Sequence, residues 1–326
     1  MIWLKLNLHF LLQAHSYHSE LNTRYGAIFY MKDEYRLVAV QRRNYVYSLE
    51  ALLIMDQLQQ LCRQVRKDVV EAIYLAGSGH PGSSLSAVEI LVTLYFTDLL
   101  RCIPQHPKYE GRDRFILSKG HAAPAYYSVL AHKGFFPLEW LPTLRSLGSP
   151  LQGHPNMVKL PCLDCAVGSL GQGLSIANGI AWALKYRHET PHVFCLIGDG
   201  EQQEGQIWEA AAFASHHHLD NVCLIVDCNG MQLVDSLKTI KDLQPFNAKW
   251  KSFGWNVMTV DGHDIDKLHQ VLSEAKAHQG CPTVVLAQTV KGKGVSYMEN
   301  QADWHGTAPN EAQYAAAMKE LSQEVL

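Results

Sequence analysis

Two short apolar segments in the middle of the chain constrain its fold more than any other feature. The first covers residues 193–197 and is followed by a Gly-Asp-Gly tripeptide; the second covers residues 222–227 and is followed by Asn229. A segment of helical length separates them. Apolar runs arranged in this way are typical of parallel strands that are buried on both faces and joined by a crossover helix. The pattern predicts an α/β fold, a parallel sheet with helices on both faces.

The rest of the chain continues this alternation of strands and helices. Further strands are expected at residues 114–117, 256–260 and 283–289, and helices at residues 84–99, 122–132, 173–186, 207–217, 265–278 and 311–324. No Pro-, Gly- or Ser-rich linker divides this region, so residues 55–326 are predicted to form one domain. Residues 1–54 differ in composition and are expected to be a weakly ordered extension or a misassigned translation start.

Polar residues follow the two central strands at the same edge of the predicted sheet. Neighbouring strands lie about 4.8 Å apart, so Asp199 and Asn229 are expected close together, where open α/β sheets bind their ligands. With the carbonyl of Met231 they form a candidate set for Mg²⁺, which usually completes its shell with phosphate oxygens. Gly198 and Gly200 allow backbone N–H groups to approach an anion. The alternative is ordinary: Asp199 caps a helix and Asn229 makes a turn.

Composition excludes several classes of function. The chain has 326 residues, of which 47% are hydrophobic, and a formal net charge of −3. No basic run supports binding to nucleic acid or anionic membranes, and no run of eighteen apolar residues could span a bilayer. Eight scattered cysteines suit reduced thiols in a cytoplasmic protein.

Seven segments together carry a family resemblance. They are AGSGHPG at 76–82, SKGHA at 118–122, QGHP at 152–155, GSLGQG at 168–173, GDG with QEG at 198–205, VKGKG at 290–294 and WHG at 304–306. In content and order they resemble the motifs of transketolases, over roughly residues 57–325. The resemblance implies the thiamine-diphosphate-binding fold, specifically its diphosphate-binding domain, with thiamine diphosphate and Mg²⁺ as cofactors.

The resemblance also implies roles for individual residues. The residues expected to contact the cofactor are His121, Gly168, Ser169, Leu170, Gly198, Asp199, Gly200, Asn229 and His305. The sequence departs from the usual pattern at Ala166-Val167, where a Ser-Thr pair is common. The segment 291–294 is expected to be either a flexible loop that closes over the cofactor or a solvated basic turn.

Four residues are candidates for catalysis. Several imidazoles around one cavity suit a reaction that moves protons among hydroxyls and a carbonyl near neutral pH. By resemblance, His80 and His305 transfer protons or stabilise an oxyanion at the reacting carbonyl, and His154 binds the terminal hydroxyl of the donor. Glu204 is expected at a subunit interface, coupled to the acid that activates thiamine.

The resemblance covers only the half of a transketolase that binds the diphosphate. The pyrimidine-binding half would follow residue 326, so the chain is expected to be the N-terminal subunit of a two-subunit transketolase. With a C-terminal subunit, in a heterotetramer, it would transfer a two-carbon ketol unit from a ketose or ketose phosphate to an aldose. The alternatives are a subunit of another thiamine enzyme, either deoxyxylulose-phosphate-synthase-like or 2-oxoacid-decarboxylating, and a non-catalytic thiamine-binding subunit.

Overall fold

Five parallel strands form the main sheet of the computed structural model, which describes residues 28–30, 37–42, 45–47 and 49–323. In spatial order the strands are β4 (Arg114–Leu117), β5 (Val193–Gly198), β6 (Val222–Cys228), β10 (Thr283–Gln288) and β9 (Asn256–Asp261). The predicted strands are confirmed to within one residue at each end. The chain forms β9 at the border of the sheet and then returns to place β10 between β6 and β9.

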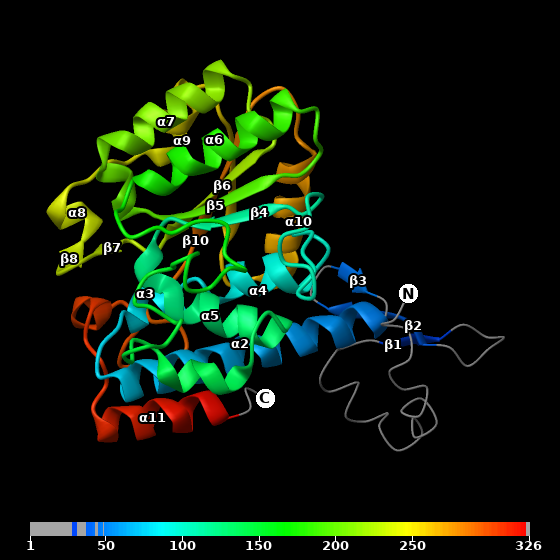
Figure 1. Cartoon of the computed structure of the whole chain (residues 1–326). Helices are drawn as coiled ribbons and strands as arrows, with labels where there is room; N and C mark the ends of the chain where they lie inside the picture. Colours follow the sequence, from blue (N-terminus) through cyan, green and yellow to red (C-terminus); the bar gives the residue numbers. More distant parts are fainter. Residues whose placement is uncertain (1–27, 31–36, 43–44, 48, 324–326) are drawn as a thin grey trace. The chain divides into compact units, whose positions relative to one another are not determined.

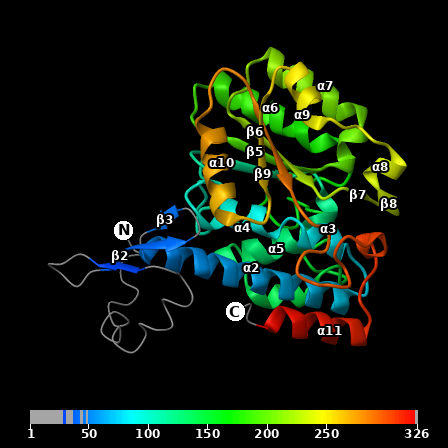
Figure 2. The same ribbon diagram turned by 180° about the vertical axis from the view of Figure 1, so that it is seen from behind.

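Helices cover both faces of this sheet, which confirms the predicted fold class (Figures 1 and 2). Apolar residues of β5 and β6 alternate between the two faces and are fully buried. One face packs against α6 (Gln172–Tyr186), α7 (Gly205–His216) and α9 (Phe246–Ser252). The other face is covered by α4 (Val88–Phe96) and α10 (Ile265–Ala277).

Three more helices pack beyond α4 in the region of residues 58–323. They are α2 (Leu49–Ala76), α5 (Ala123–Lys133) and α11 (Glu311–Ser322). The apolar spacing of α2 places Val65, Val69 and Ile73 on its buried side. Tyr74 of α2 stacks on Tyr314 of α11, with ring centroids 4.3 Å apart. No described helix combines the length and the apolar character needed to cross a bilayer.

Several short elements lie in the loops between the long helices and the strands of the main sheet. They are α3 (Pro81–Leu85), η3 (Gly120–Ala122), η4 (Leu138–Thr143), η5 (Gly200–Gln203), β7 (Met231–Gln232), β8 (Asp235–Ser236), α8 (Leu237–Ile240) and η6 (Ala302–His305). The prediction of one helix over residues 84–99 was wrong, because the helix is interrupted between α3 and α4. At the interruption the hydroxyl of Ser86 donates to Oδ2 of Asp227 over 2.6 Å, a tertiary contact that outweighs local helix periodicity.

Contacts along the chain separate residues 1–57 and 324–326 from residues 58–323. The described strands of the first group, β1 (Ile28–Tyr30), β2 (Leu37–Arg42) and β3 (Tyr45–Tyr47), form an antiparallel sheet. Much of the extension predicted for residues 1–54 lies outside the described residues, so that interpretation stays a prediction.

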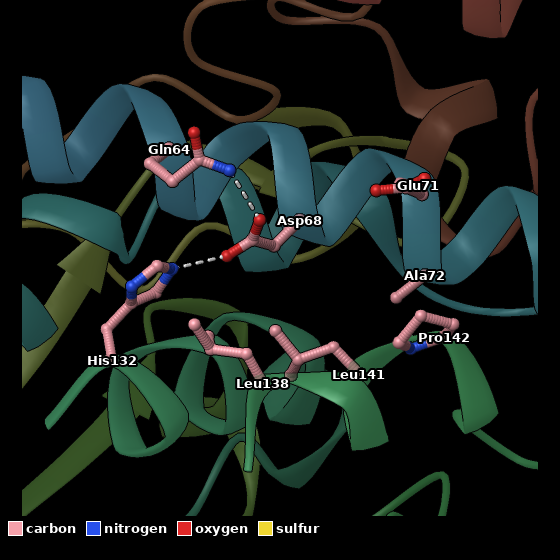
Figure 3. A pocket seen from close by; sticks show the side chains of 8 residues that line it. All are labelled: Gln64, Asp68, Glu71, Ala72, His132, Leu138, Leu141 and Pro142. Carbon is pink, nitrogen blue, oxygen red and sulfur yellow. Dashed lines mark hydrogen bonds and ion pairs between the residues drawn. The ribbon is translucent and has the colours of Figure 1, made fainter. Parts of the chain in front are cut away.

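A cavity of about 150 Å³ lies between α2 and the segment formed by α5 and η4 (Figure 3). Asp68 borders it and accepts hydrogen bonds from Gln64 (2.8 Å), Ser128 (2.6 Å) and His132 (2.7 Å). Burial alone would raise the pKa of Asp68, but these hydrogen bonds outweigh burial and lower it. The cluster ties α2 to α5.

Candidate active site

The carboxyl ends of four strands bring polar residues together at one edge of the sheet. Ser118 follows β4, Asp199 follows β5, Asn229 follows β6 and Thr289 follows β10. Register places Gly198 beside Asp227, and the backbone N–H of Asp199 donates to the carbonyl of Asp227 over 3.2 Å. The polar residues predicted for this edge are therefore neighbours.

Asp199 joins the loops that follow β5 and β6. Its side chain is 3% exposed; Oδ1 accepts the N–H of Gly200 (2.9 Å) and Oδ2 accepts the N–H of Gly230 (2.6 Å). Burial, and then the nearby carboxylate of Asp227, raise the pKa of Asp199 to about 7. Asp199 also caps η5, so the ordinary role considered from the sequence is present as well.

The oxygen donors at this edge fit a hard divalent cation. The carboxylate of Asp199 is buried beside a second carboxylate and accepts only backbone N–H groups, so a bound cation would supply the opposing charge. The amide oxygen of Asn229 lies in the adjacent loop, where it accepts the N–H of Met231 over 3.1 Å. No group of three or more His, Cys, Asp or Glu side chains in the described part of the chain could hold an ion. An ion here would therefore depend on one carboxylate with amide and carbonyl oxygens, a set typical of Mg²⁺ or Ca²⁺.

A buried ion pair lies beneath this edge. Asp227 is 0% exposed and Lys119 is 1% exposed, and the ammonium of Lys119 donates both to Asp227 and to the carbonyl of Ser83 (2.9 Å). Asp227 also accepts from the hydroxyl of Thr289 and from Nδ2 of Asn229 (3.2 Å). The pair thereby fixes the side chain of Asn229, one of the candidate metal ligands.

A second buried carboxylate connects the glycine-rich segments. Glu201 accepts hydrogen bonds from the hydroxyl of Ser118 and from the N–H groups of Gly171 (2.8 Å) and Gly198 (3.1 Å). A Cβ atom on Gly173 would lie 2.3 Å from Cβ of Ser118, so this position requires glycine. Glu201 thus holds the loops after β4 and β5 and the start of α6 in one arrangement.

Three of the predicted histidines form a cluster. Ring centroids of His80 and His121 are 5.2 Å apart, and each lies 5.4 Å from the ring of His305. His154 borders the cluster, since a Cβ atom on Gly120 would lie 3.3 Å from its ring. The structure therefore brings together imidazoles from four segments that are far apart in the sequence.

The cluster lies in a setting that keeps its histidines neutral at pH 7. Burial, followed by Arg145, His154 and Lys291, lowers the pKa of His80 to about 4. Burial and Lys291 lower the pKa of His305 to about 4, and burial also lowers the pKa of His121 and His154. A neutral imidazole has one donor and one acceptor nitrogen, so each ring can both give and accept a hydrogen bond.

Two expectations for the loops have different outcomes. Lys291 is 1% exposed, so the interpretation of segment 291–294 as a solvated basic turn was wrong for this residue; its ammonium contacts Nδ1 of His305 at 3.0 Å. Glu204 is exposed at the N-cap of α7 and makes no side-chain capping bond. Its predicted role at a subunit interface stays a prediction.

The other predicted cofactor contacts lie in the loop before α6. Gly168, Ser169 and Leu170 are all exposed, in front of the first turn of α6. A helix start of this kind presents N–H groups and a positive dipole end to an anion. The loop is therefore accessible to a ligand at the same edge as Asp199.

Sequence reasoning missed the residues that support this site from beneath. Asp227 ends an apolar strand and Lys119 lies inside the segment SKGHA. Each position is unusual for a charged residue, but no local spacing connects the two. Glu201 directly follows the GDG tripeptide but was not singled out. Arg145 gave no signal; its Nη1 donates to Ser78 over 2.9 Å, near His80.

Comparison with known proteins agrees with this geometry. The family model described as "Transketolase, thiamine diphosphate binding domain" matches residues 57–324. The chain is 42% identical to the 6-deoxy-6-sulfo-D-fructose transketolase subunit SqwG of Clostridium sp. (strain MSTE9) over 267 residues, which cover 82% of this chain and 97% of the relative. It is 37% identical to an apulose-4-phosphate transketolase subunit of Phocaeicola vulgatus, covering 83% of this chain and 96% of that relative.

A solved structure shows the same relationship. The transketolase from Leishmania mexicana superposes with a TM-score of 0.77 at 26% identity, over 82% of this chain and 41% of that one. The chain thus spans nearly all of two transketolase subunits and less than half of a longer transketolase chain. The chain belongs to the transketolase family and corresponds to its N-terminal, thiamine-diphosphate-binding part.

Proposed function

We propose that this chain binds Mg²⁺ and thiamine diphosphate and transfers a two-carbon ketol unit from a ketose to an aldose. The observation that carries the proposal is the position of the neutral histidine cluster beside the oxygen-donor edge of the sheet, where η6, which contains His305, packs against β7, which begins at Met231. Sugar chemistry needs several groups that can both give and accept protons, and the cluster provides them. An anionic donor, such as a ketose phosphate, is favoured because the names of both of these shorter relatives include a sulfonated or phosphorylated sugar.

Each part of the site has a role in this proposal. Asp199, Asn229 and the carbonyl of Met231 would hold Mg²⁺, whose charge would neutralise the diphosphate of the cofactor. The remaining cofactor contacts come from His121, Gly168, Ser169, Leu170, Gly198, Gly200 and His305. When bound, thiamine diphosphate supplies the carbanion that allows the ketose C2–C3 bond to be cleaved.

The histidines handle the protons of the sugar. His80 and His305 donate hydrogen bonds to the carbonyl oxygen as negative charge develops on it. His154 binds the terminal hydroxyl and orients the donor. Because the pKa of His80 and of His305 is about 4, each ring is neutral at pH 7 before the substrate binds and has one N–H donor.

A C-terminal partner subunit completes the enzyme in this proposal. It would contribute the pyrimidine-binding half, and Glu204 at the exposed start of α7 would lie at the contact, in a heterotetramer. Support comes from the two relatives named as subunits, which this chain spans almost completely. We place the enzyme in the cytoplasm, in carbohydrate metabolism of the pentose phosphate type.

Reconstitution tests this function. The purified chain is mixed with a candidate C-terminal subunit, Mg²⁺ and thiamine diphosphate, and ketol transfer is measured with ketose phosphate donors and, separately, with pyruvate. Transfer that requires both chains and Mg²⁺ is expected. His80→Asn should lower kcat/KM by about 10²–10⁴, whereas His106→Ala, at an exposed loop histidine, should leave it unchanged. Full activity of the chain alone would contradict the two-subunit arrangement, and turnover of pyruvate instead of ketoses would contradict the reaction.

A further inference from the structure

Lys291 is buried where three of the sequence segments meet. A Cβ atom on Gly82 would lie 3.0 Å from Cγ and Cε of Lys291 and 2.9 Å from the carbonyl oxygen of Trp304. The glycine therefore leaves the space through which the lysine side chain passes. The path ends at His305, where Nζ of Lys291 lies 3.0 Å from Nδ1 of the ring.

The backbone around Lys291 is held on both sides. The N–H of Gly292 donates to the carbonyl of Gly82 (2.9 Å), and the N–H of Asn300 donates to the carbonyl of Lys291 (2.9 Å). Nε2 of His263 accepts the N–H of Val290 over 2.8 Å. These bonds fix the backbone from which the buried side chain of Lys291 extends toward His305.

The chemistry of the two groups determines which of them donates. An ammonium group has three donors and no acceptor. Burial, and then the nearby Lys119, lower the pKa of Lys291 to about 8, so most of it is still protonated at pH 7. The ring nitrogen that faces it, Nδ1 of His305, must therefore be the acceptor and cannot carry a hydrogen.

We propose that Lys291 is a positioning residue that fixes His305 in the neutral tautomer with its hydrogen on Nε2. The nitrogen left to interact with a sugar oxygen is then a donor, as stabilisation of an oxyanion requires. The role of this donor in stabilising an oxyanion rests on the function proposed above, whereas the preference for the Nε2–H tautomer does not depend on it. Among the described residues, the groups whose charge acts on the ring of His305 are Lys291, Lys119, His80 and His121, and none of these four is an acid that would favour the charged ring.

Nitrogen NMR of the full chain, selectively labelled with ¹⁵N-histidine, tests the proposal without cofactor or partner. The signal of His305, one of 17 histidines, is identified by its loss in His305→Asn. At pH 7 the Nε2–H form should exceed the Nδ1–H form by about tenfold or more, as expected when one charge-assisted hydrogen bond favours one form. A predominant Nδ1–H form, or a doubly protonated ring, would overturn the proposal, and this measurement needs no variant of Lys291.

A pair of variants in the same loop supplies the control. Lys291→Met should reduce the tautomer ratio by about tenfold and raise the pKa of His305 toward 6.5, because a nearby cation has been removed. Lys293→Met removes a lysine that is 38% exposed and paired with Glu299, and should change neither value. If Lys291→Met leaves both values unchanged in a folded protein, the lysine does not position the ring. A failure of ketol transfer in reconstitution would leave this result intact, so the two proposals fail separately.

Discussion

Replacement of Asp227 by alanine tests how strongly the fold depends on the charge buried under the sheet edge. Asp227 is completely buried and accepts hydrogen bonds from Lys119, Ser86, Thr289 and Asn229. In the variant, the ammonium of Lys119 stays in the interior with the carbonyl of Ser83 and the weaker contact to Ser86 (3.5 Å) as its neighbours. An interior charge without its counter-ion is costly.

The expected decrease in the free energy of unfolding follows from the burial of both Lys119 and Asp227. Removing one member of a buried ion pair costs about 3–5 kcal/mol, and the three further hydrogen bonds lost by Asp227→Ala favour the upper part of this range. Asp98→Ala is the matched control, because the carboxylate of Asp98 also has a hydrogen-bond partner at 2.8 Å, Nε2 of His269, but its side chain is 87% exposed. An exposed pair of this kind contributes about 0–1 kcal/mol.

Urea unfolding at pH 7 measures both variants. A shift in the midpoint with an unchanged slope reports stability directly. The double variant Lys119→Met, Asp227→Ala should be more stable than the sum of the two single losses implies, because it no longer buries an unpaired charge. If Asp227→Ala costs no more than Asp98→Ala, the pair does not stabilise the fold and the reasoning from burial is refuted.

Three further predictions concern pH, glycine and the cluster in Figure 3. His80 and His305 have a pKa of about 4 in the folded chain and about 6.5 when unfolded. The stability that the two neutral rings contribute is therefore complete above pH 6.5 and should be lost as pH falls from 6.5 to 4. Urea unfolding at a series of pH values should show this loss, and His80→Asn should show a smaller one. Gly179 lies in the middle of α6 with no atom within 4 Å of an added Cβ, so Gly179→Ala should stabilise the fold by about 0.5–1 kcal/mol. Gly173→Ala should destabilise the fold, because its Cβ would overlap the side chain of Ser118. Thermal melts that rank the two variants in the opposite order would contradict this. Asp68→Ala removes the acceptor shared by Gln64, Ser128 and His132 and should cost about 1–3 kcal/mol; an unchanged midpoint of urea unfolding would contradict this.

The local pattern of the sequence was sufficient to predict the strands and the proximity of Asp199 to the loop that contains Asn229. Both follow from apolar runs of strand length and from the rule that parallel strands end at one edge. The strand order was not accessible in this way, because the position of β10 between β6 and β9 depends on pairing between distant segments.

The supporting network was also out of reach of local patterns. Lys119 and Asp227 are 108 residues apart, and neither has a spacing that would connect them. The interruption at Ser86 has the same origin, since its hydroxyl bonds to Asp227, 141 residues away. Periodicity describes which face of an element is buried, but it contains no information about which polar groups meet inside.

The place of β10 in the sheet has a consequence for synthesis of the chain on the ribosome. β9 pairs only with β10 in the described sheet, and residues 283–288 are made after the other four strands of that sheet. Until these residues emerge, β6 has an unpaired edge and β9 has no strand to pair with. The nascent chain then exposes unpaired backbone N–H and C=O groups on both strands, and these can pair with other chains. β10 is thus the strand that completes the described five-stranded sheet, and a chain that stops growing before residue 283 would be an aggregation-prone intermediate instead of a smaller stable domain.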